Sequence, residues 1–184
     1  MRGWCTATAM WRRVKQVVAA LTASVTEADR AFVAEILAPA EQQLFFAMNL
    51  PDQYHALQVA YTARSLAAGR SDVDRGLLLK GALLHDVGKV KGDVSTFDKA
   101  AAVVAHRLAP GLAESWSRPG RGGKVDNLRH ALHVYFHHPE RSVALLAGVD
   151  DDERLTDIIR RHHQPPAVGE PPELTILRAA DERH

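Results

Sequence analysis

Residues 81–92 read GALLHDVGKVKG, an apolar run that ends in adjacent His85 and Asp86 and is then broken by Gly88. A helix that faces a core gains nothing from an isolated carboxylate at its end. A buried carboxylate without a partner destabilises a fold, or its pKa rises until it takes up a proton. The stretch therefore predicts that Asp86 has a partner elsewhere in the chain.

Length and composition restrict what kind of protein this can be. With 184 residues, 46% of them hydrophobic and 24% charged, the chain is expected to form one soluble globular domain. A net charge of +1 gives no signal for nucleic acid or for an anionic membrane, so an anionic ligand would be held by local charges. No stretch approaches the roughly 20 apolar residues of a membrane span. The single cysteine, Cys5, fits a reducing compartment, and we expect a cytoplasmic protein.

Helical periodicity recurs from residue 11 onward, without a run of alternating β-branched residues. The expected fold class is therefore all-α, a single-domain helical bundle. Thr26 and Asp29 resemble an N-terminal capping pair, and Pro39 and Pro51 suit the first turn of a helix. The predicted helices cover 11–23, 27–37, 40–48, 52–68, 72–87, 96–108, 126–136, 139–147, 151–162 and 172–182.

Two segments rich in glycine and proline are expected to be loops. The first, SWSRPGRGGKVDN at 115–127, is either a surface connection or a loop that faces phosphate through Arg118, Arg121 and Lys124. The second, QPPAVGEPP at 164–172, directly follows a histidine pair.

Several of the ten histidines lie where a solvated helix would not need them. His55 is surrounded by apolar residues, where a lone histidine is more often a hydrogen-bonded core residue than a ligand. Other candidates follow it along the chain, namely the His85-Asp86 pair, His137-His138, His162-His163 and Asp181. Imidazole and carboxylate without sulfur favour a divalent ion such as Mn or Fe, with Mg, Zn and Ni as alternatives. Asp86 has two carboxylate oxygens and could bridge two ions.

The HDVGK block, with a histidine upstream and an aspartate downstream, resembles the HD superfamily of metal-dependent phosphohydrolases, whose fold is all-helical. The resemblance covers roughly residues 50–184 and implies that one metal ion is bound by His55, His85, Asp86 and Asp181. We accordingly expect an HD hydrolase domain at 51–184. It would be preceded at 1–50 by an N-terminal tail and accessory helices that pack on the core and could support a homodimer.

Two further elements resemble those of two-metal members of this superfamily. They are HPERS at 138–142 and RRHHQP at 160–165, and they imply His138, His162 and His163 as ligands of a second ion with Asp86 as the bridge. His138 is preferred to His137 because it directly precedes Pro139, where a helix would begin. The alternative is that these histidines cap a helix or orient other ligands. The GYP signature of the cyclic-dinucleotide branch is absent after His163, so that branch is not predicted.

The resemblance implies hydrolysis of a phosphoester or phosphoanhydride of a nucleotide, or of a related small phosphate compound, by metal-activated water. Asp86 and Lys89 are the predicted catalytic residues. Lys89 would stabilise the phosphoryl oxygens, or else only satisfy carbonyls at a helix end. Arg141, Arg160 and Arg161 are weaker candidates for binding phosphate. The rival functions are a di-iron HD-type oxygenase and a nucleotide-binding signalling module without catalysis.

Overall fold

The computed structural model describes residues 24–184, which form helices connected by loops and contain no strand. The predicted all-α class is therefore confirmed for this part of the chain, whereas the helix predicted at 11–23 lies outside it, as does Cys5. The helices in chain order are α2 Glu27–Ile36, α3 Pro39–Phe46, α4 Leu50–Leu66, α5 Arg75–Leu84, α6 Thr96–Leu108, α7 Pro110–Trp116, α8 Lys124–Leu146, α9 Glu153–Arg161 and α10 Pro172–Asp181. Among them no helix combines the length and the apolar character needed to cross a membrane.

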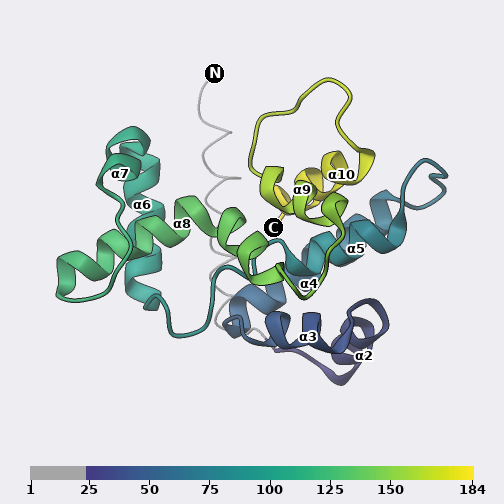
Figure 1. Ribbon diagram of the computed structural model, residues 1–184, viewed down its shortest axis with the longest axis horizontal. Helices are drawn as coiled ribbons and strands as arrows, with labels where there is room; N and C mark the ends of the chain where they lie inside the picture. The colour runs from purple at the N-terminus through teal and green to yellow at the C-terminus, as the bar shows by residue number, and fades with distance from the viewer. Residues whose placement is uncertain (1–23) are drawn as a thin grey trace, which may run out of the picture.

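The main core lies between α4, α5, α9 and α10, which gather on one side of the molecule (Figure 1). Leu78 of α5, Ile158 of α9 and Leu177 of α10 are all fully buried there. Gly81 lets α9 approach closely, since a Cβ atom at this position would lie 2.6 Å from Cδ1 of Ile158. This packing brings the C-terminal ends of α5 and α9 together.

Helices α2 and α3 pack against α5, and Phe32, Val33 and Phe45 contribute to the main core. The capping pair predicted at the start of α2 is present, because the Asp29 backbone N–H donates to Thr26 Oγ1. Whether residues 1–50 form a unit separate from the rest stays a prediction.

A buried ion triad ties α3 and α5 to the segment after α8. The Lys80 ammonium lies 2.7 Å from Glu41 Oε1 and 2.7 Å from Asp150 Oδ2. The Glu41 side chain is 1% exposed, so its charge depends on this ammonium for compensation.

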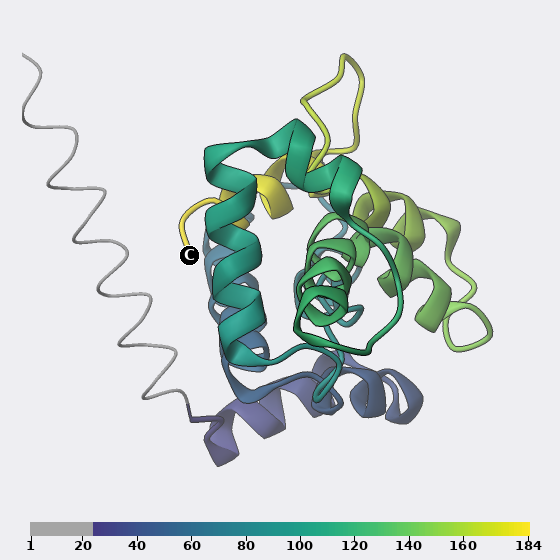
Figure 2. The ribbon, with the colours of Figure 1, turned by 90° about the vertical axis from the view of Figure 1, so that its left-hand side faces the viewer.

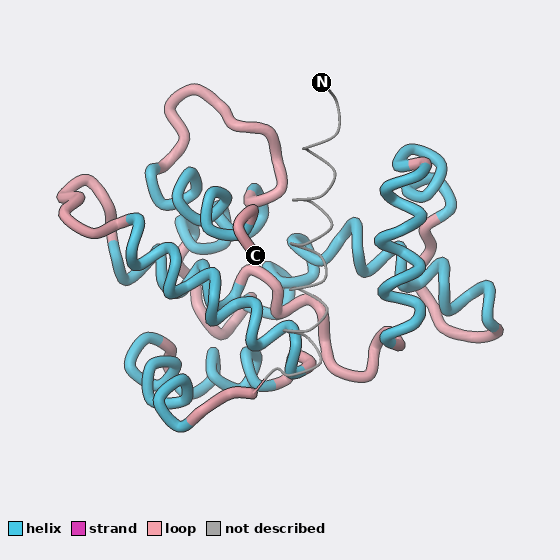
Figure 3. The backbone as a smooth tube through the Cα atoms, turned by 180° about the vertical axis from the view of Figure 1, so that it is seen from behind, coloured by secondary structure: helices cyan, strands magenta, loops and turns pink. Residues whose placement is uncertain are grey.

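Helices α6 and α7 and the beginning of α8 form a lobe that projects from the other helices (Figures 1 and 3) and faces the viewer in Figure 2. The lobe has its own small apolar cluster, made of Ala102, Ala113, Ala131 and Leu132. Helix α8 continues from the lobe to the main body, where it contacts α9. It therefore carries residues of both parts.

The prediction that a helix begins at Pro139 is wrong, because α8 runs through this residue without a break. Proline has no N–H to donate to the carbonyl four residues earlier, which belongs to Tyr135. Here the His138 side chain replaces that donor, with Nδ1 2.8 Å from Tyr135 O. The helix thus tolerates the proline in its interior.

Other element boundaries also differ from the predictions. Helix α5 is shorter than the predicted 72–87, since it starts after the cap Asp74 and ends before His85. Helix α7 was not predicted, although Pro110 stands at its first turn. As a result, the first expected loop is reduced to 117–123, whereas the second, between α9 and α10, is confirmed.

Candidate metal centre

Asp86 lies just beyond the end of α5, in a turn that presses against α8. Gly88 makes this contact possible, because a Cβ atom there would lie 2.5 Å from His138 O and 2.9 Å from Ser142 N. Asp86 itself is 2% exposed. The glycine that breaks the helix therefore also brings the carboxylate to α8.

The Ser142 hydroxyl joins the two segments. It accepts a hydrogen bond from the Gly88 N–H at 2.9 Å, and its own hydrogen faces the carbonyls of His85 and His138, each 2.8 Å away. The Ser142 hydroxyl thereby satisfies backbone groups that would otherwise be buried without a partner.

One set of donors comes from α4, the end of α5 and α10. His55 Nε2 lies 3.0 Å from Asp181 Oδ1 and 3.8 Å from Asp86 Oδ2. His85 Nε2 lies 3.5 Å from Asp86 Oδ2 and 3.8 Å from Asp181 Oδ1. The four residues predicted as first-metal ligands are thus brought together from segments up to 126 positions apart.

A second set of donors is adjacent to the first and comes from α8 and the end of α9. His138 Nε2 lies 3.0 Å from His163 Nε2 and 3.3 Å from Asp86 Oδ1. The ring of His162 contacts those of His138 and His85, with centroids 5.5 and 5.0 Å away. Their ligand atoms lie within 4.8 Å of one another in three overlapping groups: His55, His85 and Asp86; His85, His162 and Asp181; and His138, His162 and His163.

Three of the imidazoles are oriented by a carbonyl oxygen three residues earlier. Nδ1 of His85, His138 and His162 lies 2.9, 2.8 and 2.6 Å from the oxygens of Ala82, Tyr135 and Ile159, respectively. Since a carbonyl can only accept, each Nδ1 carries the proton and each Nε2 keeps its lone pair. Nε2 of His85 and of His162 is buried and has no hydrogen-bond partner among residues 24–184. Such orphaned lone pairs beside two carboxylates fit a bound cation.

The protonation states of the imidazoles suit the same role. Burial lowers the pKa of His85, and burial together with the charge of Lys89 holds the pKa of His138 well below its usual range. Burial is the main cause that lowers the pKa of both His162 and His163 to about 4. At neutral pH these four rings are therefore uncharged, which is the form that binds metal.

The carboxylates stay ionised. Burial tends to raise the pKa of Asp86, but the charge of Lys89 and the nearby His85 and His138 outweigh it and hold this pKa well below its usual value. Burial likewise opposes ionisation of Asp181, whose pKa is nevertheless lowered, chiefly by the hydrogen bond with His55. Burial lowers the pKa of His55, but the two carboxylates raise it above its ordinary value overall.

Lys89 faces Asp86 rather than solvent. Its ammonium lies 2.8 Å from Oδ2 and 2.7 Å from Oδ1 of Asp86, and its side chain is 24% exposed. Lys89 is therefore part of the centre, and its pKa is raised because the Asp86 charge outweighs the opposing effect of burial.

The other predicted phosphate contacts lie in different surroundings. Arg141 donates to Gly88 O at 3.1 Å and pairs with Asp93, while Arg121 donates to Gly92 O at 3.0 Å. Both arginines thus hold the segment after the HDVGK block. Of the remaining basic candidates, Lys124 begins α8, Arg118 lies in the loop before it, and Arg161 pairs with Asp157.

No local pattern predicts one hydrogen bond that supports this segment, between His130 and Asp93. His130 Nε2 lies 2.7 Å from Asp93 Oδ1. The two residues are 37 positions apart, and only the contact between the HDVGK turn and α8 brings them together. His137, the alternative to His138, has its ring centroid 4.5 Å from that of His133 and belongs to none of the three donor groups.

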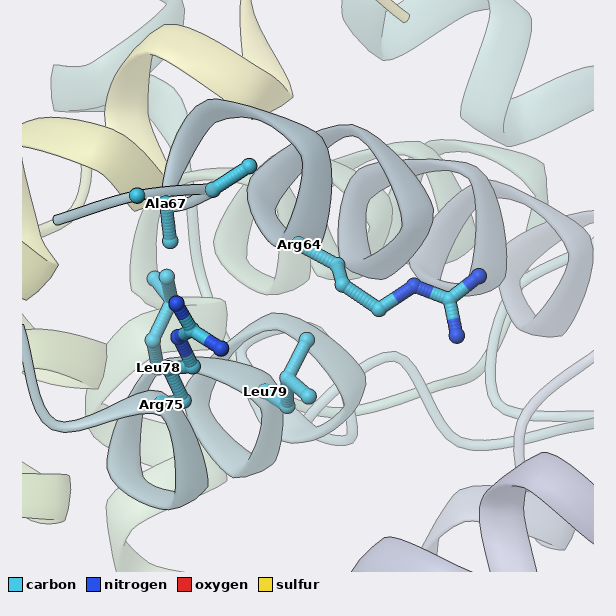
Figure 4. Close-up of a pocket in the computed structure, with 7 residues that line it drawn as sticks. Arg64, Ala67, Arg75, Leu78 and Leu79 are labelled. Atoms are coloured by element: carbon cyan, nitrogen blue, oxygen red, sulfur yellow. The ribbon is translucent and has the colours of Figure 1, made fainter.

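A separate pocket of about 370 Å³ lies between the end of α4 and the start of α5 (Figure 4). Arg64 and Arg75 line this pocket together with the apolar side chains of Leu78 and Leu79. The two guanidinium groups point to different places and do not converge on one ligand position (Figure 4). None of the predicted metal ligands lines this pocket.

The composition and geometry of the donor cluster can be compared with known families. The family model of the HD domain matches residues 53–184. The chain belongs to the HD-domain family. HD domains form a superfamily of metal-dependent phosphohydrolases that bind divalent ions, and the match includes every residue of the donor cluster. No curated protein and no solved structure matched the chain.

Membership of the HD family confirms the resemblance seen in the HDVGK block. The match begins within α4, so α2 and α3 precede it. The assignment of individual ligands, and of a branch within the family, stays a prediction.

Proposed function

We propose that this HD domain is a metal-dependent phosphohydrolase that cleaves a phosphoester or phosphoanhydride bond in a nucleotide or a related small phosphate compound. In this proposal, His55, His85, Asp86 and Asp181 hold one divalent ion. His138, His162 and His163 hold a second, with Asp86 between the two. Mn and Fe suit the imidazole and carboxylate donors, and Mg, Zn and Ni are the alternatives.

The observation that carries the proposal is the orientation of the Asp86 carboxylate. Its Oδ2 lies 3.8 and 3.5 Å from Nε2 of His55 and His85, whereas its Oδ1 lies 3.3 Å from Nε2 of His138. The two oxygens therefore face two different sets of imidazoles. A carboxylate placed in this way supports a bridging role.

Divalent ions bound at these residues would lower the pKa of a water molecule so that hydroxide forms near neutral pH. The chain's own residues would supply the rest. Lys89 brings a positive charge to the centre, where it would neutralise phosphoryl oxygens. Each of the neutral rings of His138, His162 and His163 has one ring nitrogen with a lone pair that can bind the ion, and none adds a positive charge of its own.

The proposal is tested by elemental analysis of the purified protein, together with phosphate-release assays in added Mn²⁺ on a panel of nucleotides and model phosphodiesters. We expect about two ions per chain and phosphate release from at least one substrate class. Asp86→Ala should lose the bound ions and the activity. Asp72→Ala is the matched control, because Asp72 is exposed and pairs with Arg70, a neighbour on the surface.

Three results would contradict the proposal. Metal retained in Asp86→Ala would show that Asp86 is not the shared ligand. A wild-type protein that binds no metal, even with added Mn²⁺, would show that the buried donors serve another purpose. Two irons with oxygen consumption and without phosphate release would instead support the di-iron oxygenase.

A further inference from the structure

The inference concerns how α8 orients His138. At His85 and His162 the ring Nδ1 bonds a carbonyl near the C-terminal end of a helix, because each of these residues caps the helix before it. The last carbonyls of a helix have no backbone donor of their own, so a side chain can use them. Two rings of the centre are thus oriented by helix ends.

His138 makes the same contact in the middle of a helix. Helix α8 continues for eight residues after it, to Leu146. In a regular helix the N–H of residue 139 would donate to the Tyr135 carbonyl, and the ring would have to share this acceptor with it. Residue 139 is proline, which has no N–H, and the Tyr135 carbonyl lies 2.8 Å from His138 Nδ1.

We propose that Pro139 is a positioning residue for the metal centre. It frees the Tyr135 carbonyl so that the carbonyl accepts the His138 Nδ1 proton and directs the Nε2 lone pair toward Asp86 and His163. The role rests on the proposed function in so far as Nε2 of His138 is a ligand of the second ion. The fixed tautomer itself exists without metal.

The contact between His138 and His163 agrees with this tautomer. His138 Nε2 lies 3.0 Å from His163 Nε2, so one of the two nitrogens must donate and the other accept. With the proton of His138 on Nδ1, its Nε2 is the acceptor and His163 is the donor. The Tyr135 carbonyl therefore determines which of the two Nε2 atoms donates and which accepts.

The decisive variant is Pro139→Ala, because alanine keeps the helix and restores the N–H at residue 139. That N–H would compete with the His138 ring for the Tyr135 carbonyl. We expect the second ion to bind about 10- to 100-fold more weakly, which is the usual effect of removing a group that orients a ligand. Binding of the first ion should stay within about 2-fold, the measurement uncertainty, since its ligands lie on α4, α5 and α10.

Pro110→Ala is the matched control. Pro110 stands in the first turn of α7, where an N–H has no acceptor within the helix. This substitution should change neither binding constant. Far-UV circular dichroism of all proteins would verify that the helices are retained.

Two measurements test the proposal. Long-range ¹H–¹⁵N NMR of the metal-free protein reports which His138 nitrogen is protonated, and calorimetric titration with Mn²⁺ reports the two binding constants. We expect the Nδ1–H form of His138 in the wild type and in Pro110→Ala. In Pro139→Ala we expect a shift toward the Nε2–H form and selective loss of the second ion.

An unchanged tautomer in Pro139→Ala would overturn the proposal. Equal weakening of both ions would also overturn it, because it would indicate a general structural effect. A wild-type protein that binds only one ion would refute the second ion of the proposed function. The tautomer measurement would in that case still decide the role of Pro139.

Discussion

Replacing Gly88 by alanine tests the contact that brings Asp86 to α8. The new Cβ atom would lie 2.5 Å from His138 O, 2.9 Å from Cβ of Arg141 and 2.9 Å from Ser142 N. Two of these three atoms belong to the backbone of a helix, so a change of rotamer cannot relieve the overlap. Overpacking a core typically destabilises by about 1–3 kcal/mol, and this site should reach about 3 kcal/mol. For a domain of this size, that lowers the midpoint of thermal unfolding by roughly 6–12 °C.

The assay is thermal and urea unfolding of the metal-free protein, followed by circular dichroism in the presence of a chelator. Gly111→Ala is the control, because Gly111 lies in the first turn of α7 and no atom of the described part of the chain lies within 4 Å of an added Cβ. It should be neutral or more stable by up to about 1 kcal/mol. If Gly88→Ala unfolds within about 0.5 kcal/mol of the wild type, the close approach of the HDVGK turn to α8 is not a constraint on the fold.

Two further predictions concern charged groups away from the centre. The hydrogen bond from Arg178 is the main cause that lowers the pKa of Glu170 to about 2. The ionised Glu170 therefore stabilises the fold fully above the ordinary pKa of a glutamate, and this stabilisation is lost as the pH falls from about 4.5 toward 2. Glu170→Gln should therefore be less stable at pH 7 and show a smaller loss over that acid range in urea titrations; an unchanged pH dependence would contradict this. Lys80→Met leaves the buried Glu41 beside Asp150 without its ammonium and should lower the free energy of unfolding at pH 7 by about 3 kcal/mol. Adding Glu41→Gln should restore part of that loss, and no restoration would show that the triad is not the cause.

The fold class and the family could be predicted from the sequence because both depend on local patterns. Helical periodicity needs no tertiary information, and the HDVGK block places a histidine and an aspartate next to a helix-breaking glycine. The order of the other histidines and of the late Asp181 then allowed a donor cluster to be predicted. The structure brings these side chains together, and their role as ligands awaits the metal analysis.

Two of the errors have a common physical origin in proline. Read from the sequence alone, Pro139 predicts a helix start, whereas α8 accommodates it because a side chain supplies the missing donor. His138 was thus preferred to His137 for a reason that proved wrong. Helix α7 is not predicted because Pro110 and Gly111 are typical of a loop. The apolar cluster in which Ala113 is buried is a tertiary contact that the local sequence does not indicate.

Long-range charge contacts could not be predicted at all. The Lys80 ammonium meets Glu41 and Asp150 across 39 and 70 positions, respectively. Nothing in the local sequence of the three residues distinguishes them from surface charges. Only the packing of α3 and α5 with the segment that follows α8 selects these partners.

The contact between Lys89 and Asp86 means that the donor cluster contains a cation of its own. In the proposed function, loading of a divalent ion would therefore be an exchange, in which the incoming ion competes with an ammonium that lies 2.7–2.8 Å from the carboxylate oxygens. Because this competitor is covalently tethered, dialysis and dilution cannot remove it. In a sample treated with a chelator, the Asp86 carboxylate would thus still be paired with the Lys89 ammonium. In the proposed function, the measured affinity for metal would reflect the difference between the free energies with which the ion and the ammonium bind the same carboxylate.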